Sequence, residues 1–405
     1  MLTADMIKKE IGGYFDEIVS FRRHLHMHPE TGLDTKETEA YIRRFLEDEG
    51  VGVLESQVGV IGCIKGGKSS GCCVALRADM DALPLAEEND VPYKSQVPGK
   101  MHACGHDGHT AMLMGAAHVL NKHRGVLCAD VVLIFQPAEE GPFPGGAVIM
   151  LEDLKKLGLF EKIKAVIALH LTTEHPAGKV AIGWGSMMAS TDEYDIEITG
   201  VGGHVGLPHK AVDALSIAAK FVTDMESFMS RRIDPFDSAV FGTGVMRAGS
   251  ARNIIPEKAV LSGSLRCQRE ETRLYVLENA EKILKALCEA YGARYEMKVT
   301  RGLPVLRNDD AVVAVMEESA EETAGADNII RLRSSNMGAE DFAFFSEVKP
   351  AAFVWIGARN EEKGFTHMMH NPKFDIDEEA LKTGAALLCR AAAGLGEKTR
   401  AETEA

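Results

Sequence analysis

Residues 72–84 read CCVALRADMDALP, a nearly continuous apolar run that stops at two aspartates. The segments ADVVLIFQ (129–136), KAVIALH (164–170) and AAFVWIG (351–357) are similar apolar runs. Continuous apolar strands are typical of a parallel sheet that is buried on both faces. The stretches between them carry apolar residues at helical spacing. The sequence therefore predicts an α/β fold in which a mostly parallel sheet is covered by helices.

The helices expected around this sheet follow from the same periodicity. They cover residues 4–25, 36–49, 109–123, 146–157, 311–323 and 378–393.

The pattern changes near Ser190, where DEYDIEITG (192–200) alternates polar and apolar residues as a half-exposed strand does. The order of elements from there to about residue 300 is β-α-β-β-α-β, which is that of a ferredoxin-like module. We therefore expect an α+β domain at 190–300, inserted into a catalytic domain formed by 1–189 and 301–405.

Composition excludes several classes of protein. The 405 residues are 45% hydrophobic and 26% charged, as in an ordinary globular protein, and the net charge is −15. So acidic a chain is not expected to bind nucleic acid or an anionic membrane. No apolar run reaches the roughly 18 residues of a membrane span. With no export signal visible, the 8 cysteines are expected to be reduced thiols, and the location cytoplasmic.

The apolar strands lead into acids or end in histidine. Asp79 and Asp81 follow the first, Glu139 and Glu140 follow the second, and His170 ends the third. Ligands of open α/β sheets gather at the carboxyl ends of strands. If these strands are neighbours, the five polar side chains converge on one crevice.

The densest cluster of reactive side chains is MHACGHDGH (101–109). Cys104 and His106 are two apart, so in an extended chain their side chains face the same way. A helix that starts after them would favour the thiolate of Cys104. Thiolate, imidazole and carboxylate together indicate a transition-metal site. The roles of His102 and His109 stay open.

The adjacent residues Glu139 and Glu140 are suited to two different roles. One carboxylate can bind metal, while its neighbour takes a proton from a metal-bound water.

Eight segments, taken together, resemble a known family. They are RRHLHMHPE (22–30), ALRADMDALP (75–84), MHACGHDGH (101–109), FQPAEEG (135–141), GGHVGLPH (202–209), NIIP (253–256), GAEDF (338–342) and HNPKFDIDEEAL (370–381). They look like the aminoacylase/carboxypeptidase metallopeptidase family. The branch is that of hippurate hydrolases, N-acyl-amino-acid amidohydrolases and indole-acetyl-amino-acid hydrolases.

The resemblance implies a site for two divalent metal ions. The implied ligands are Cys104, which would bridge both metals, and His106, Glu140, His170 and His370. Glu139 would be the general base. Asp79 and Asp81 stand where the wider family has a His-x-Asp motif with a histidine ligand. Since that histidine is missing here, His106 would compensate, and both aspartates would lie behind the ligands.

The inserted module is implied to be a lid and a dimerisation domain. His204 matches a histidine that in relatives reaches the active site of the partner subunit of a homodimer, where it stabilises the tetrahedral oxyanion. Asn253 and Arg266 match positions that hold the substrate, and a guanidinium can grip a carboxylate with two hydrogen bonds.

The function that follows is that of a metal-dependent amidohydrolase. Metal-bound hydroxide would attack the amide of an N-acyl amino acid, with Glu139 as the base. A dipeptidase or carboxypeptidase acting on short peptides is the alternative, and a metal-free hydrolase using Cys104 and His106 is a weaker one. A catalytically silent binding protein is disfavoured because Glu139 is present. The ligand types suit Mn²⁺ or Zn²⁺, and also Co²⁺ or Ni²⁺.

Overall fold

The computed structural model describes residues 1–334 and 336–404, of which the last three by backbone alone. The chain forms two compact units. Unit 1 comprises residues 1–185, 307–334 and the chain from 341 onward. Unit 2 comprises residues 186–306 and a short segment that ends at Glu340. The sequence placed these boundaries at 189/190 and 300/301, and it did not assign the short segment to the inserted domain.

Unit 1 contains an eight-stranded sheet in the order β1-β2-β4-β3-β5-β16-β6-β15. Its strands are β1 (Gly52–Leu54), β2 (Val60–Ile64), β3 (Cys73–Asp79), β4 (Asp130–Gln136), β5 (Ile163–Pro176), β6 (Val180–Ile182), β15 (Ile329–Arg331) and β16 (Ala351–Arg359). The central strands β4, β3, β5 and β16 run parallel to one another. The predicted mostly parallel α/β sheet is therefore confirmed.

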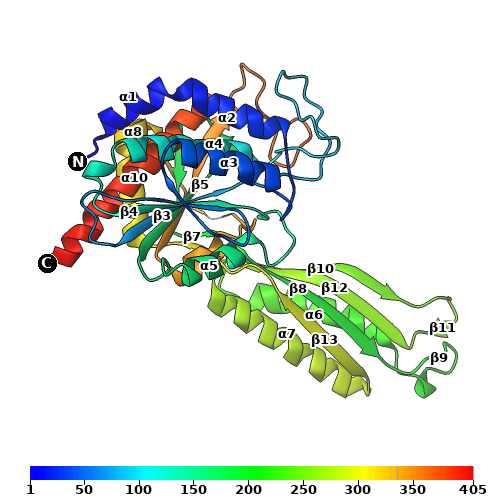
Figure 1. The fold of residues 1–405 in the computed structure, drawn as a ribbon. Helices are drawn as coiled ribbons and strands as arrows, with labels where there is room; N and C mark the ends of the chain where they lie inside the picture. Colours follow the sequence, from blue (N-terminus) through cyan, green and yellow to red (C-terminus); the bar gives the residue numbers. More distant parts are fainter. Residues whose placement is uncertain (335, 405) are drawn as a thin grey trace. The chain divides into compact units, whose positions relative to one another are not determined.

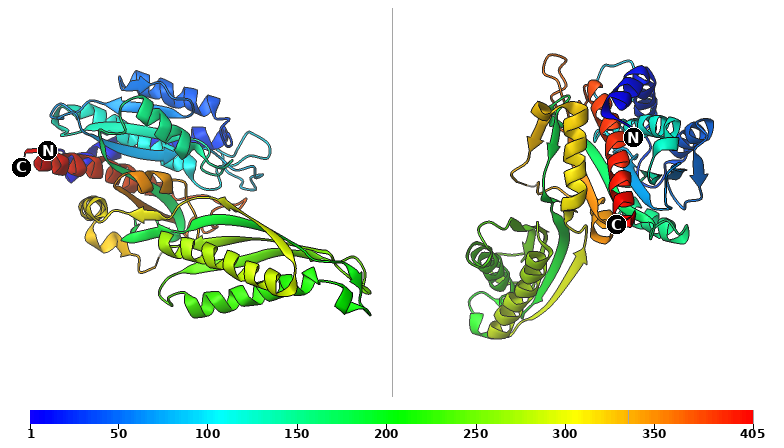
Figure 2. Two further views of the ribbon diagram at one scale, coloured as in Figure 1. Left: turned by 90° about the horizontal axis from the view of Figure 1, so that it is seen from below. Right: turned by 90° about the vertical axis from the view of Figure 1, so that its left-hand side faces the viewer.

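Helices cover both faces of this sheet (Figures 1 and 2). They are α1 (Ala4–Gly13), α2 (Phe15–Met27), α3 (Lys36–Asp48), α4 (His106–Lys122), α5 (Gly146–Lys156), α8 (Asp310–Ala324), α9 (Ala343–Val348) and α10 (Glu379–Glu404). Helices α4 and α10 pack on each other and on β3 and β5. Helix α5 lies on the opposite face, against β4 and α9. No helix in the described part of the chain is long and apolar enough to cross a membrane.

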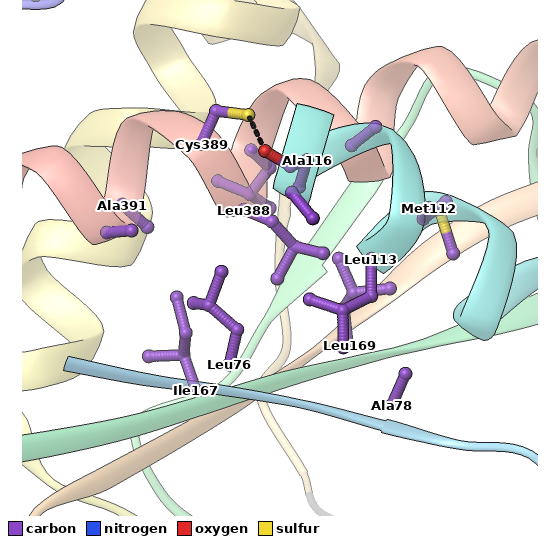
Figure 3. Close-up of a cluster of buried hydrophobic side chains, with 14 of the residues drawn as sticks. Leu76, Ala78, Met112, Leu113, Ala116, Ile167, Leu169, Leu388, Cys389 and Ala391 are labelled. Atoms are coloured by element: carbon purple, nitrogen blue, oxygen red, sulfur yellow. Dashed lines mark hydrogen bonds between the residues drawn. The ribbon is translucent and has the colours of Figure 1, made fainter. Parts of the chain in front are cut away.

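The core of unit 1 lies between α4, α10 and the central strands (Figure 3). Leu76 and Ile167 project from β3 and β5 toward Leu113 of α4 and Leu388 of α10, and all four are fully or almost fully buried. Each buried side chain of this size contributes about 1.5–3 kcal/mol. Cys389 lies in the same layer and donates to the carbonyl of Ala116, so it is one of the core residues.

Several element boundaries differ from the prediction. The expected opening helix breaks at Tyr14 into α1 and α2, directly after Gly12 and Gly13, which are poor helix formers. Helix α4 begins at His106, because Gly105 adopts the left-handed conformation (φ 93°) that turns the chain into it. Strand β5 continues to Pro176 rather than ending at His170, and α10 continues to Glu404.

Unit 2 has the predicted β-α-β-β-α-β order. Its elements are β8 (Ser190–Thr199), α6 (Ala214–Arg232), β10 (Ala239–Ala248), β12 (Lys258–Cys267), α7 (Glu270–Tyr291) and β13 (Arg294–Arg301), with a short pair β9 (Gly203–His204) and β11 (Ile254–Ile255). The four long strands form an antiparallel sheet in the order β10-β12-β8-β13. Helices α6 and α7 pack on it to form a separate core. Strands β7 (Gly185–Met188) and β14 (Leu306–Asn308) pair where the chain passes between the units.

A buried ion pair joins α7 to the sheet of unit 2. Arg273 donates to both carboxylate oxygens of Asp192 at 2.6 Å, and both side chains are almost fully buried. Removing one partner of such a pair leaves a buried charge without compensation. The pair therefore makes the docking of α7 sensitive to a single substitution.

We expect Arg273→Ala to destabilise unit 2 by about 3–5 kcal/mol, because the buried side chain of Asp192 loses its partner. Scanning calorimetry of the full chain should show the loss. Lys282→Ala is the control, since Lys282 pairs with Glu278 on the exposed face of the same helix, and its effect should stay within about 0.5 kcal/mol. Equal effects of the two substitutions would contradict the prediction.

Candidate metal centre

The strands bring the predicted residues to one edge of the unit 1 sheet. Asp79 is the last residue of β3. On the neighbouring strand β5, Ala168 pairs with Arg77, which places His170 level with Asp79. Helix α4 begins at this edge with His106, and Thr110 of the same helix donates to the carbonyl oxygen of Asp79 at 2.9 Å.

Five side chains that the resemblance implies as ligands meet at this edge. Ligand atoms of Cys104, His106 and Glu140 all lie within 4.8 Å of one another. Cys104 Sγ lies 3.5 Å from His170 Nε2. His370 Nε2 lies 3.0 Å from Glu140 Oε1, although His370 is 264 residues beyond His106 in sequence. The structure thus brings together every one of these residues.

Two of the imidazoles are oriented by backbone carbonyls. His106 Nδ1 lies 2.9 Å from the carbonyl oxygen of Asp81, and His170 Nδ1 lies 2.7 Å from that of Leu171. A carbonyl oxygen only accepts, so each Nδ1 carries the proton that it donates. In the neutral ring, this leaves the lone pair on Nε2. His106 Nε2 is buried and has no hydrogen-bond partner among the described residues. Rings held in this way are typical of histidines that bind metal.

Asp81 also fixes the two adjacent glutamates. Its carboxylate accepts from the backbone N–H groups of Glu139 at 3.0 Å and Glu140 at 3.2 Å. Ala138, just before the pair, has a positive φ of 57°, which is uncommon for a residue with a side chain. This backbone turn places the side chain of Glu140 beside Cys104 and His106. Glu139 Oε2 lies 4.0 Å from His106 Nε2.

Asp79 and His109 form a hydrogen-bonded pair beside the cluster, and ligand atoms of both lie within 4.8 Å of those of His106 and His170. His109 Nδ1 lies 2.5 Å from Asp79 Oδ1, and His109 Nε2 accepts from the N–H of Leu171 at 2.8 Å. Both ring nitrogens of His109 are therefore engaged, which answers the question that the sequence left open. Asp79 also binds Arg77 at 2.7 Å and lies 3.8 Å from His106 Nε2.

The pKa shifts of two candidate ligands, His106 and Glu140, indicate that the site favours a cation. Burial disfavours a charged ring at His106, but the carboxylate of Asp79 and the thiol of Cys104 raise its pKa well above the usual value. Burial would raise the pKa of Glu140, yet His370 and His106 hold it below the usual value. Protons and metal ions compete for such ligands. The residues present thus fit a bound metal ion.

Cys104 differs from the expectation in its protonation. Burial raises the pKa of its thiol well above the usual value when no cation is present. Although α4 starts nearby, Cys104 lies before Gly105 and outside the helix, so burial outweighs the helix dipole. A neutral, buried thiol is a poor nucleophile, which argues against the metal-free cysteine hydrolase.

His102 is a further buried residue of this segment. Neither of its ring nitrogens has a hydrogen-bond partner among the described residues. Burial lowers its pKa to about 3, so the ring is neutral. It does not belong to the cluster of candidate ligands.

The remaining predicted residues lie in unit 2. His204, in β9, is exposed, and its Nδ1 accepts from the N–H of Gly206 at 3.0 Å. Asn253 is also exposed, and it lines the same surface hollow as His204. Arg266, in β12, is half-buried and donates to the carbonyl of Met337 at 3.5 Å. Their side chains are therefore held less firmly than those in unit 1.

The polar layer beneath Asp79 was not predicted from the sequence. Arg77 is buried in β3 and donates to Gln136 at 3.0 Å and to Asp341 at 2.7 Å, in addition to Asp79. Gln136 donates in turn to Asp341. The sequence feature that could have revealed this layer is Arg77 itself, an arginine inside an otherwise apolar strand. Such a buried charge needs buried partners.

Comparisons with known proteins agree with this geometry. The model of Peptidase family M20/M25/M40 matches residues 75–394. A putative amidohydrolase of Bacillus subtilis (strain 168) is 38% identical over 388 residues, which is 95% of this chain and 96% of its own. An N-acetylcysteine deacetylase of the same organism is 36% identical over 371 residues, covering 91% and 94%.

The fold is also shared with solved structures. A Bacillus subtilis protein, described as a dinuclear metal-binding peptidase from the M20 family, matches with a TM-score of 0.81 and 32% identity, over 95% of this chain and 99% of its own. These matches confirm the resemblance seen in the motifs. The chain belongs to peptidase family M20/M25/M40, and it is a metal-dependent hydrolase.

Proposed function

We propose that this protein is a dinuclear metal-dependent amidohydrolase that releases the acyl group from N-acyl amino acids. The observation that carries the proposal is the fixed orientation of His106 and His170. Each ring donates its Nδ1 proton to a backbone carbonyl, which leaves the lone pair on Nε2. His106 lies with Cys104 and Glu140, and His170 Nε2 lies 3.5 Å from Cys104 Sγ. The N-acetylcysteine deacetylase and amidohydrolase relatives support the class of substrate.

The metal ligands in this proposal are Cys104, His106, Glu140, His170 and His370. When bound, two divalent ions would polarise the substrate carbonyl and lower the pKa of water. Asp79 and Asp81 orient the ligands from behind, since Asp79 lies beside His106 and Asp81 bonds to His106 and to the glutamate pair.

Glu139 acts as the general base. Its backbone is held by Asp81 in the same way as that of Glu140. Glu139 Oε2 lies 4.0 Å from His106 Nε2, so its carboxylate stands beside the candidate ligands. It takes a proton from the attacking water and delivers it to the leaving amine, which becomes the free amino acid.

Unit 2 completes the substrate site in this proposal, as a lid and as the dimerisation domain. Asn253 and Arg266 bind the α-carboxylate or the acyl oxygen of the substrate. His204 serves the active site of the partner subunit in a homodimer, where it stabilises the oxyanion. The exposure of His204 and Asn253 is compatible with that task, since neither side chain is buried within its own unit.

The two glutamates provide the sharpest test of these roles. Glu139→Gln should keep about two metal ions per subunit and lose at least about 10²- to 10⁴-fold in kcat, because it lacks the base. Glu140→Gln should lose metal, because a ligand is gone. Metal analysis and steady-state kinetics of both variants, prepared side by side, decide the matter, and the opposite pattern would reverse the two assignments.

The substrate class is tested by a panel in which only the acyl group changes. We expect N-acetyl, N-benzoyl or indole-acetyl amino acids to be hydrolysed after reconstitution with Mn²⁺, Zn²⁺, Co²⁺ or Ni²⁺, and EDTA to abolish the activity. Dipeptides with a free amine serve as the comparison. Cleavage of dipeptides alone would favour the dipeptidase, and hydrolysis that resists EDTA would refute the metal centre.

The role of His204 is tested by complementation between inactive subunits. His204→Ala and Glu139→Gln proteins should each be inactive. Mixed dimers should regain activity, because one of their two sites receives an intact Glu139 and an intact partner's histidine. Subunit exchange is shown separately with differently tagged copies. Given exchange, unrecovered activity would contradict the trans role, and a monomer would contradict the dimer.

A further inference from the structure

A cluster of buried charges surrounds Arg22 of α2 and includes none of the candidate metal ligands. Arg22 is 1% exposed. Its Nε donates to Asp107 at 2.8 Å, its Nη2 to Asp375 at 2.7 Å and its Nη1 to Glu378 at 3.3 Å. The planar guanidinium offers its donors in a fixed fork, so the three carboxylates are held in fixed directions.

Two of these carboxylates belong to chain segments that carry candidate ligands. Asp107 directly follows His106 in the first turn of α4. Asp375 lies five residues after His370, in the loop that leads to α10. Arg22 therefore links two ligand-bearing segments that are far apart in sequence. Helices α2 and α4 pack against each other along this link (Figure 1).

His26, one turn further along α2, strengthens the same link. It is fully buried, with Nδ1 2.8 Å from Asp107 and Nε2 3.3 Å from Glu87. The loop around Glu87 is hydrogen-bonded to the segment that follows His370. The N–H of Glu88 donates to the carbonyl of Pro372 at 2.9 Å. The buried cluster thus holds that segment from two sides.

The backbone of His370 needs such support. Its φ is 65°, a conformation that a residue with a side chain adopts only when its surroundings impose it. Its N–H donates to the carbonyl of Ala103, next to Cys104, at 2.8 Å. At the same time its ring is half exposed, so packing around the side chain fixes it only weakly. Besides the contact of Nε2 with Glu140, contacts of the neighbouring backbone therefore set where the ring lies.

We infer that Arg22 is a positioning residue of the metal centre, which sets the geometry of His106 through Asp107 and of His370 through Asp375. Arg22 contacts neither ligand. This inference rests on the ligand roles proposed above for His106 and His370. A stabilising role alone would not require the link, because well-packed apolar residues are often as stable as a buried ion cluster.

The test compares two buried arginines. Arg22→Lys keeps the charge but loses the fork, and a lysine cannot reproduce the directed bonds. Arg273→Lys makes the same change at the buried pair with Asp192 in unit 2. Both proteins are stripped of metal and reconstituted with Co²⁺. The measurements are Co²⁺ affinity by competition with a chelator, the cobalt and thiolate–cobalt absorption bands, and urea unfolding of the metal-free chains.

We expect Arg22→Lys to bind Co²⁺ about 10- to 100-fold more weakly, as when the partners behind metal ligands are removed, and to show altered absorption bands. Arg273→Lys should keep the wild-type affinity and spectrum, even if it unfolds at lower urea. Asp375→Asn retains the bond from Arg22 to Asp107, so it should weaken Co²⁺ less. If Arg22→Lys does not fold, the Co²⁺ affinity of Asp375→Asn decides whether the Arg22 cluster positions the ligands.

Three outcomes separate the possibilities. Unchanged Co²⁺ affinity and spectrum in Arg22→Lys, or in Asp375→Asn if that is the only variant that folds, would overturn the inference. So would an equal loss of affinity in Arg273→Lys, because the effect would then be general destabilisation. If the wild-type chain itself binds no Co²⁺, the proposed function fails first, and the inference fails with it.

Discussion

Asp81 is the residue on which the candidate metal centre depends. Its carboxylate accepts from the backbone of Glu139 and Glu140, and its carbonyl accepts from the ring of His106. One residue thus sets the directions of a proposed base and two proposed ligands. Because the three hydrogen bonds share one short loop after β3, a shift of this loop would move all three side chains together. The loop follows directly on β3, a strand that is buried along its whole length, which restrains such a shift.

Buried charge in unit 1 is organised by two arginines. Arg77 compensates Asp79 and Asp341, while Arg22 compensates Asp107 and Asp375, and both arginines are 1% exposed. Burying so many ions is costly unless each is paired and hydrogen-bonded. Both groups contact the start of α4, Arg22 through Asp107 and Asp79 through His109. Within the described part of the chain, the candidate ligands themselves contact neither arginine, and bound metal ions would supply positive charge beside Glu140.

The features of the fold and site that depend on local residue pattern or on strand topology could be predicted from the sequence. Apolar runs gave the strands, and because parallel strands present their carboxyl ends at one edge, residues such as Glu140 and His170 could be expected to meet. Pattern could not separate His106 from His109. Both lie in the first turn of α4, and only the bonds of His109 to Asp79 and to the backbone of Leu171 distinguish them. Nor could it show that Arg22 joins α4 to the loop before α10, since that contact spans most of the chain.

The discontinuity of unit 1 has a consequence for biosynthesis. Every residue of unit 2 leaves the ribosome before α10, whose side chains complete the core against α4. The inserted module can therefore fold during translation, while its host still lacks a helix and the histidine at position 370. The host must keep its exposed apolar sheet from aggregating during that interval. We expect nascent chains paused before α10 to bind chaperones through the host, and to carry a module that already resists protease.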